Sequence, residues 1–257
     1  IFVIQELEIE RWSHFEPGCK FQVHTFCDAS EEGMCVAVYL RVRNSKKEIH
    51  VTLLAAKSRV SPLKAESISR LELVACTMGT RISHAVRDVY PSKVEDTFFW
   101  TDSMVSLHWI FVPAKAFRAY VAHRVGEIQN FTEPQQWRHV PGKMNPADIG
   151  TREVSAVELK ESTLWWKGPE FLHKPESEWP KRRIIEVPED PELKPSFVKA
   201  VDVDRGVDVQ ETGLKAEQHG RSAFPGVISQ EERAHRKSLN IRFDERSEER
   251  RVGKECR

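Results

Sequence analysis

A chain of 257 residues with 40% hydrophobic content is long enough to bury a core. Its 39 basic and 39 acidic residues cancel, so no overall positive field marks it as a nucleic-acid-binding protein, and any such function must come from a local site. The five cysteines contain no Cys-x-x-Cys pair and are odd in number, which argues against a zinc knuckle and a disulfide framework and favours a reducing intracellular setting.

The composition changes near residue 180. All seven tryptophans lie at or before Trp179, whereas residues 181–257 contain 33 charged residues and only three aromatic ones. Such a stretch predicts a largely disordered C-terminal tail. No secretory signal or apolar run of about 20 residues is visible, so no membrane partner is expected. Because the chain begins with Ile1 and not with Met, we expect a fragment of a longer polypeptide.

Three strands open the predicted fold. The segment "FQVHTFCDAS" predicts a strand that ends at Asp28, and "GMCVAVYLRV" a second strand that follows the turn at Gly33. After the polar turn "RNSKKE", "EIHVTLLAAKSRV" predicts the third. Together they form an antiparallel meander.

A long helix is predicted next, in "KAESISRLELVACTMGTRISHAV", with Ser61 available as its cap. Its apolar residues recur at helical spacing and predict the face that packs on the core. These residues are Ile68, Leu71, Val74, Ala75, Met78 and Ile82.

The remaining elements alternate. "TFFW" predicts a fourth strand that ends at Asp102, "SMVSLHWIF" a helix up to Pro113, and "FRAYVAHRVGEIQNF" another amphipathic helix. "QQWRHV" predicts a strand, and "NPADIGTREVSAVEL" a last helix with Asn145 as its cap and Pro146 at its first position. The predicted order is β-β-β-α-β-α-α-β-α, an α/β fold.

Four acids fall where this topology can bring them together. They are Asp28 and Asp102 at strand ends, Glu72 within the long helix, and Asp148 in the first turn of the last helix. Carboxylates this close repel one another unless a cation neutralises them. Mg²⁺ prefers oxygen ligands, and two such ions about 4 Å apart can activate a water and stabilise a leaving oxygen. The pattern favours phosphoryl chemistry with Mg²⁺ or Mn²⁺, with two ions bound.

Six segments, in this order, resemble the ribonuclease H domain of BEL/Pao-type LTR-retrotransposon polyproteins. They are "HTFCDASEEGMCVAVYLR", "SRLELVA", "FFWTDSMVSLHWI", "FRAYVAHRVGEIQ", "WRHVPGKMNPADIGTR" and "LWWKGPEFL". The resemblance implies a ribonuclease H-like mixed five-stranded sheet flanked by helices, and hydrolysis of the RNA strand of RNA–DNA hybrids during reverse transcription. It also implies a cytoplasmic particle or the nucleus as the location, and the reverse transcriptase domain of the same polyprotein as a partner.

The resemblance also assigns residues and boundaries. The family's metal-binding carboxylates fall on Asp28, Glu72, Asp102 and Asp148. The expected parts are the end of the connection from reverse transcriptase (1–20), the ribonuclease H-like domain (21–155), a helical extension (156–180) and a linker (181–245). Residues 246–257, "RSEERRVGKECR", resemble the read-through translation of a sequencing adapter and are interpreted as a non-native tail.

Each candidate also has a structural explanation. Asp28 and Asp102 are placed where a strand-terminal acid can shape a turn, and the helix dipole alone can account for Asp148. Glu66 competes with Glu72 as the inward acid, and we choose Glu72 because it lies beside the apolar face. His139 is either a loop histidine that assists product release, as in related enzymes, or a strand histidine paired for structure.

A second group of residues could contact a nucleic acid. Four basic side chains could line a groove for backbone phosphates, although such residues also serve solubility, and two tryptophans could stack on nucleotides, although tryptophan is usually core. They are Lys115, Arg118, Arg124 and Lys143, with Trp109 and Trp137.

Three other functions were weighed. A non-catalytic ribonuclease H-like module that binds hybrid or braces the polymerase would keep the fold without cleaving, although the intact carboxylates disfavour it. The aspartic peptidase of the same polyprotein class needs a D-[ST]-G turn, and "CDAS" lacks the glycine. An integrase is disfavoured because no His-His-Cys-Cys pattern appears.

Overall fold

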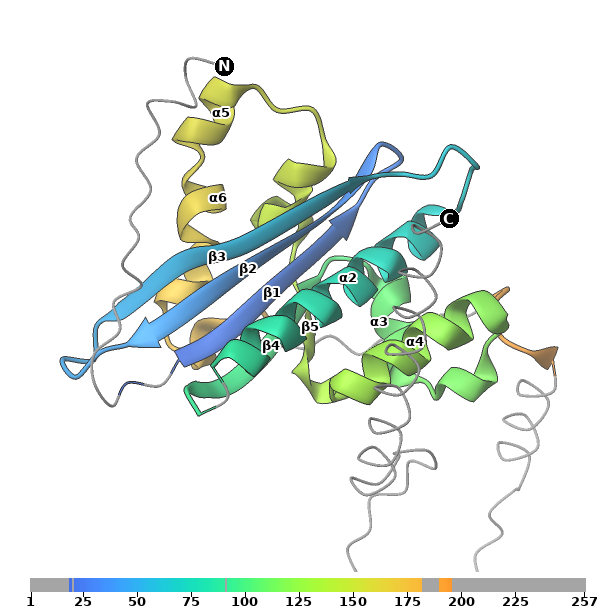
Figure 1. Cartoon of the computed structure of the whole chain (residues 1–257), viewed down its shortest axis with the longest axis horizontal. Coiled ribbons are helices and arrows are strands. Elements are labelled where there is room, and N and C mark those ends of the chain that lie inside the picture. The colour runs from blue at the N-terminus through green and yellow to red at the C-terminus, as the bar shows by residue number, and fades with distance from the viewer. Residues whose placement is uncertain (1–18, 20, 91, 182–189, 196–257) are drawn as a thin grey trace, which may run out of the picture. The chain divides into compact units, whose positions relative to one another are not determined.

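The computed structural model describes residues 19, 21–90, 92–181 and 190–195 (Figure 1). Its centre is a five-stranded sheet in the order β3-β2-β1-β4-β5. The strands are β1 (Phe21–Ala29), β2 (Gly33–Arg43), β3 (Ile49–Val60), β4 (Val94–Thr101) and β5 (Trp137–His139). The first three pair antiparallel, whereas β4 pairs parallel with both β1 and β5, so the predicted mixed five-stranded sheet is confirmed.

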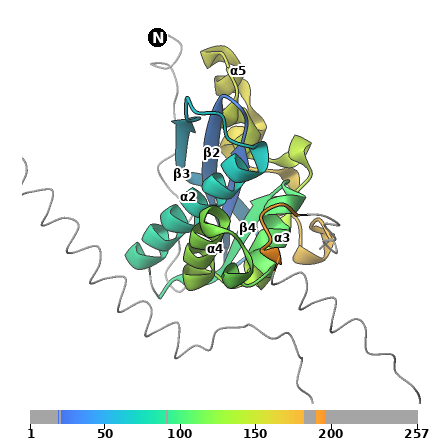
Figure 2. The ribbon, with the colours of Figure 1, turned by 90° about the vertical axis from the view of Figure 1, so that its right-hand side faces the viewer.

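Helices cover both faces of the sheet (Figures 1 and 2). On one face α2 packs on β1 and β2, and α3 and α4 pack beside it, while α6 packs against β3 from the other face. The helices are α2 (Ile68–Val89), α3 (Met104–Phe111), α4 (Ala119–Phe131), α5 (Ala156–Glu161) and α6 (Thr163–Lys167). Among the described helices, none combines the length and the apolar composition of a membrane-spanning segment.

Short 3₁₀ helices make up much of the remaining chain. They are η1 (Ala114–Ala116), η2 (Pro134–Gln136), η3 (Gly142–Met144), η4 (Pro146–Thr151), η5 (Glu170–His173) and η6 (Glu176–Glu178). Two of them, η3 and η4, follow the end of β5, and η4 packs against β1 and β2. This arrangement carries the segment 142–151 across the ends of the central strands.

The central strands form the core, because β1 and β2 are buried along almost their whole length. On the face covered by residues 156–180, Phe26 stacks on Trp100, and Phe171 packs against both rings. Trp179 is also buried there, edge-on to Trp100, and Arg41 donates hydrogen bonds to the carbonyls of Leu172 and Lys174. The extension after residue 155 therefore completes the core.

Two features of helix α2 differ from the sequence prediction. Its N-cap is Ser67, while the hydroxyl of Ser61, the predicted cap, donates to the carbonyl of Ser30. Of the predicted apolar stripe, Leu71, Ala75 and Met78 are buried, but Ile68 is 38% exposed because it lies in the first turn, at the rim of the core.

The predicted last helix is interrupted. The segment from Asn145 begins with the predicted cap, whose side chain accepts from the amide of Ala147, but it forms the 3₁₀ helix η4 and ends at Thr151. A new helix, α5, starts at the capping box of Ser155 and Glu158. Close packing accompanies the break: a β-carbon at Gly150 would collide with the sulfur of Cys35, so η4 lies tightly against β2.

Two acids within the predicted linker make specific contacts. Asp190 accepts a hydrogen bond from the indole of Trp109, and Glu192 forms an ion pair with Arg70. The predicted tail therefore makes specific contacts with the domain at these two positions, because composition alone does not reveal individual hydrogen bonds or ion pairs. Of the predicted linker, the structure describes only residue 181 and residues 190–195. The rest of the linker lies outside the described residues, as do the segments 1–18 and 246–257.

Candidate active site

The parallel pairing of β1 with β4 brings two of the predicted acids to one edge of the sheet. Phe26 lies opposite Trp100 in this register, so Asp28 and Asp102, each two residues further on, reach the same level. Burial and the neighbouring charge of Asp102 raise the pKa of Asp28 from 3.8 to about 7.

The other two acids come from helical segments. Glu72 lies in the second turn of α2, where burial and the charge of Asp102 raise its pKa from 4.5 to about 7. Asp148 lies in η4, and its charge adds to the rise in the pKa of Asp28. The charge of Asp102 therefore acts on both Asp28 and Glu72, and that of Asp148 acts on Asp28.

The competing acid of helix α2 is turned to another partner. Glu66 forms an ion pair with Arg70, with 3.0 Å between its Oε2 and Nη1. It precedes the N-cap Ser67 and so lies just outside the helix. Glu72, in contrast, accepts a hydrogen bond from the hydroxyl of Ser103, the residue that follows Asp102. This geometry supports the choice of Glu72 over Glu66.

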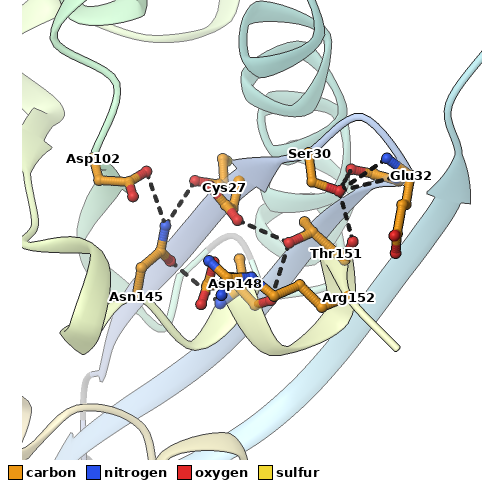
Figure 3. Close-up of polar contacts among 11 residues, drawn as sticks. Cys27, Ser30, Glu32, Asp102, Asn145, Asp148, Thr151 and Arg152 are labelled. Carbon is orange, nitrogen blue, oxygen red and sulfur yellow. Dashed lines mark hydrogen bonds and ion pairs between the residues drawn. The ribbon is translucent and has the colours of Figure 1, made fainter. Parts of the chain in front are cut away.

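Three polar side chains hold the acids in place, and sequence reasoning did not assign them to the site. The hydroxyl of Thr151 lies 3.0 Å from Oδ2 of Asp28, and Ser103 donates to Glu72. The amide of Asn145 lies 3.4 Å from Oδ1 of Asp102 and 3.1 Å from the carbonyl of Cys27 (Figure 3). Asn145 was recognised only as a cap, and nothing in the sequence pattern marks Thr151 or Ser103 as partners of an acid.

The chain also passes close to Asp102 and Asp148. A β-carbon at Gly142 would lie 2.9 Å from Oδ2 of Asp102, so only a glycine lets η3 approach the carboxylate this closely. Asp148 pairs with Arg152 four residues later (Figure 3). The Arg152 side chain is 67% exposed, so this pair is open to solvent.

His139 ends strand β5 and lies opposite Thr101, the residue before Asp102. This register places it at the same edge of the sheet as the acids. Of the basic residues, Lys143 lies in η3, next to Gly142 and so near Asp102. The other three, Lys115, Arg118 and Arg124, belong to the segment of η1 and α4.

The residues predicted to contact a nucleic acid differ in their exposure to solvent. Lys115, Arg118 and Lys143 are exposed, whereas Arg124 stacks 3.6 Å from the ring centre of Tyr120 and donates to its carbonyl. The expectation that Trp109 or Trp137 stacks on nucleotides is wrong, because both are buried, with 3% and 0% of their surface exposed. Both are instead core residues: Trp137 stacks on Phe99, and the Trp109 indole is bonded to Asp190.

The donor set fits a hard divalent cation. All four acids offer carboxylate oxygens, and their mutual repulsion is what a bound cation would relieve. In the part of the chain that the structure describes, however, no three His, Cys, Asp or Glu side chains are already arranged to hold a metal ion. Binding would therefore require these side chains to reorient about a pair such as Asp28 and Asp102.

One family model matches part of the chain. Residues 2–103 match the family described as the Pao retrotransposon-like RNaseH-like domain. The resemblance drawn from the sequence is confirmed over this interval, which includes Asp28, Glu72 and Asp102. Asp148 and His139 lie beyond it. No curated protein matches the chain in sequence.

Several solved structures share parts of the fold. The N-terminal RNase H domain of a Mycobacterium tuberculosis protein, solved as a fusion with maltose-binding protein, is 10% identical, with a TM-score of 0.34 over 51% of this chain and 94% of that one. RNase H1 from Halobacterium salinarum is 11% identical, with a TM-score of 0.31 over 50% and 90%. Thermus thermophilus RuvC is 12% identical, with a TM-score of 0.27 over 59% and 87%. At these scores the likenesses support no further conclusion.

Proposed function

We propose that this chain contains the ribonuclease H domain of a BEL/Pao-type retrotransposon polyprotein and hydrolyses the RNA strand of RNA–DNA hybrids in a metal-dependent reaction. The observation that carries the proposal is that Asp28 and Glu72, both buried or half-buried, are each raised in pKa to about 7 by burial and by the charge of Asp102, with Asp148 adding to the rise at Asp28. Buried acids whose pKa is raised by one another are typical of functional sites. The family match over residues 2–103 supports the same class of activity.

In this proposal the four carboxylates hold Mg²⁺ or Mn²⁺, with Asp28 and Asp102 as the central pair. When bound, two such ions supply an activated water and stabilisation of the leaving oxygen. The protein's own contribution is to position the ligands: Asn145 orients Asp102 and Ser103 orients Glu72. His139, at the same edge of the sheet, assists product release.

The substrate's phosphates would meet basic side chains near the site. Lys143 follows Gly142, which approaches Asp102, while Lys115 in η1 and Arg118 at the N-cap of α4 are exposed. Exposed basic groups contribute affinity that weakens with salt, because each phosphate contact releases counterions. The proposed partners are therefore the hybrid duplex and the reverse transcriptase domain of the same polyprotein, inside a cytoplasmic particle or the nucleus.

The test is cleavage of an end-labelled RNA–DNA hybrid by the purified full chain, alone and joined to its polymerase. We expect cleavage of the RNA strand with Mg²⁺ or Mn²⁺ and none with a chelator, and no cleavage of single-stranded RNA or duplex DNA. Asp102→Asn is the matched inactive control. If the protein joined to its polymerase binds hybrid and never cuts it, the non-catalytic module is the correct assignment.

A further inference from the structure

The side chain of Thr151 contacts both the carboxylate of Asp28 and the main-chain carbonyl of Asp148. It ends η4 and is buried, with 3% of its surface exposed. Its hydroxyl lies 3.0 Å from Oδ2 of Asp28 and 3.0 Å from the carbonyl oxygen of Asp148. A hydroxyl carries one proton, so it donates to one of these oxygens at a time. The geometry places both acceptors within its reach.

The main chain fixes where this hydroxyl lies. The carbonyl of Thr151 accepts a hydrogen bond of 2.7 Å from the hydroxyl of Ser30, in the turn that follows Asp28 (Figure 3). The Ser30 hydroxyl in turn accepts from the amides of Glu32 and Gly33. Gly150, the residue before Thr151, packs directly on Cys35 of β2. The main chain is therefore held at Gly150 and at the carbonyl of Thr151, and this fixes the direction from which the Thr151 hydroxyl approaches Asp28.

We propose that Thr151 is a positioning residue for the metal site: its hydroxyl holds Oδ2 of Asp28 and so would fix the orientation of this carboxylate when it serves as a ligand. This inference rests on the proposed function, because it concerns a ligand of the same site. Hydrogen bonds to a ligating carboxylate restrict its orientation, and loss of such a partner typically lowers metal affinity by about 10 to 100-fold. Thr151 does not itself touch the reacting atoms.

A merely structural role makes a different prediction. If Thr151 served only to satisfy the carbonyl of Asp148, removing its hydroxyl would lower the stability of the fold without a specific effect on metal binding. Valine has nearly the shape of threonine and lacks the hydroxyl, while serine keeps the hydroxyl and lacks the methyl group. The pair Thr151→Val and Thr151→Ser therefore separates the hydroxyl from the packing.

The experiment measures Mn²⁺ binding to the full chain by the loss of the free-ion electron paramagnetic resonance signal, thermal unfolding in chelator, and kcat and KM for hybrid cleavage. We expect Thr151→Val to bind Mn²⁺ about tenfold or more weakly and to lose kcat with little change in KM, while Thr151→Ser stays within about threefold of the wild type. In chelator, Thr151→Ser should unfold close to the wild-type temperature.

Three results would overturn the inference: wild-type Mn²⁺ affinity in Thr151→Val, equal losses in Thr151→Val and Thr151→Ser, or loss of affinity in Thr151→Ser alone. If Thr151→Val does not fold, the folded Thr151→Ser variant still decides, since retained affinity is required of it, and Thr151→Ala replaces valine with the same expected loss. A wild type that neither binds Mn²⁺ nor cuts hybrid overturns the proposed function as well. A wild type that does both, beside an unaltered Thr151→Val, overturns only this inference.

Discussion

Four buried or half-buried acids of this domain form two groups with opposite surroundings. Asp28 and Glu72 lie against another acid, Asp102, whereas Glu66 and Glu192 both lie against Arg70. All four are partly or largely buried, so burial does not distinguish the groups. The sign of the neighbouring charge does: the first group is destabilised when ionised and the second is neutralised. An arrangement that opposes folding points to a function for the first group, and ordinary packing accounts for the second.

Removal of one charge from the first group should have the largest effect. We expect Asp102→Asn to lower hybrid cleavage by several orders of magnitude, because it removes a full ligand charge while keeping the side chain's size. In chelator, the same change should leave the unfolding temperature equal or higher, since it removes a repulsive charge near Asp28 and Glu72. Cleavage assays and thermal unfolding of the same samples check both.

Glu66→Gln, just before the N-terminus of α2, is the matched control. It removes an acid that pairs with Arg70 and should leave cleavage nearly intact. If Glu66→Gln abolishes cleavage and Glu72→Gln does not, the assignment of the inward acid to Glu72 is wrong.

The stability of the fold should depend on pH through the first group of acids. The folded pKa of Asp28 and of Glu72 is about 7, against ordinary values of 3.8 and 4.5, so between about pH 4 and 7 the folded protein holds protons that the unfolded chain has lost. The stability contributed by these protons is complete below about pH 4 and is lost as the pH rises through 7. Without metal, the loss from the pair should be on the order of 2–4 kcal/mol, after allowance for their coupling.

Urea unfolding in chelator at several pH values between 4 and 8 measures this loss. Asp28→Asn and Glu72→Gln should each flatten the profile and raise the stability near pH 8. A wild-type profile that rises steadily from pH 4 to 8 would show that these acids ionise normally in the folded protein.

A bound divalent cation should offset the loss of stability that ionisation of the first group causes, and should have no such effect on the second group. A ligand that binds only the folded state at 100 times its dissociation constant adds about 2.7 kcal/mol. We expect Mn²⁺ to raise the unfolding temperature of the wild type at pH 7.5 by several degrees, and that of Asp28→Asn by much less. An equal shift in both proteins would place the bound Mn²⁺ elsewhere.

The smallest effect is expected in the second group. Glu192→Gln removes one of the two acids that pair with Arg70, whose side chain is partly exposed. Its cost in unfolding free energy should be about 1 kcal/mol or less, should shrink at high salt, and should leave cleavage unchanged. A large loss of cleavage in this variant would mean that the two groups of acids are coupled.

The elements that carry the acids could be predicted from local sequence patterns. Alternation and apolar runs end at Asp28 and at Asp102, and these patterns are local, so β1 and β4 were predictable with their terminal carboxylates. The apolar side of α2 was also sufficient to favour Glu72 over Glu66. Resemblance to a known family added the common site for these acids and Asp148.

The neutral side chains that contact the acids, and the chain segments that approach them, became apparent only in the folded protein. Thr151 meets Asp28 across 123 residues and Asn145 meets Asp102 across 43, and no local period encodes contacts of that range. The same reason explains the interrupted last helix, which stops where Gly150 packs on Cys35, the burial of Trp109 and Trp137, and the pairing of Glu192 with Arg70. Periodicity specifies the face of an element, whereas the partner of a given side chain depends on how two distant elements pack together.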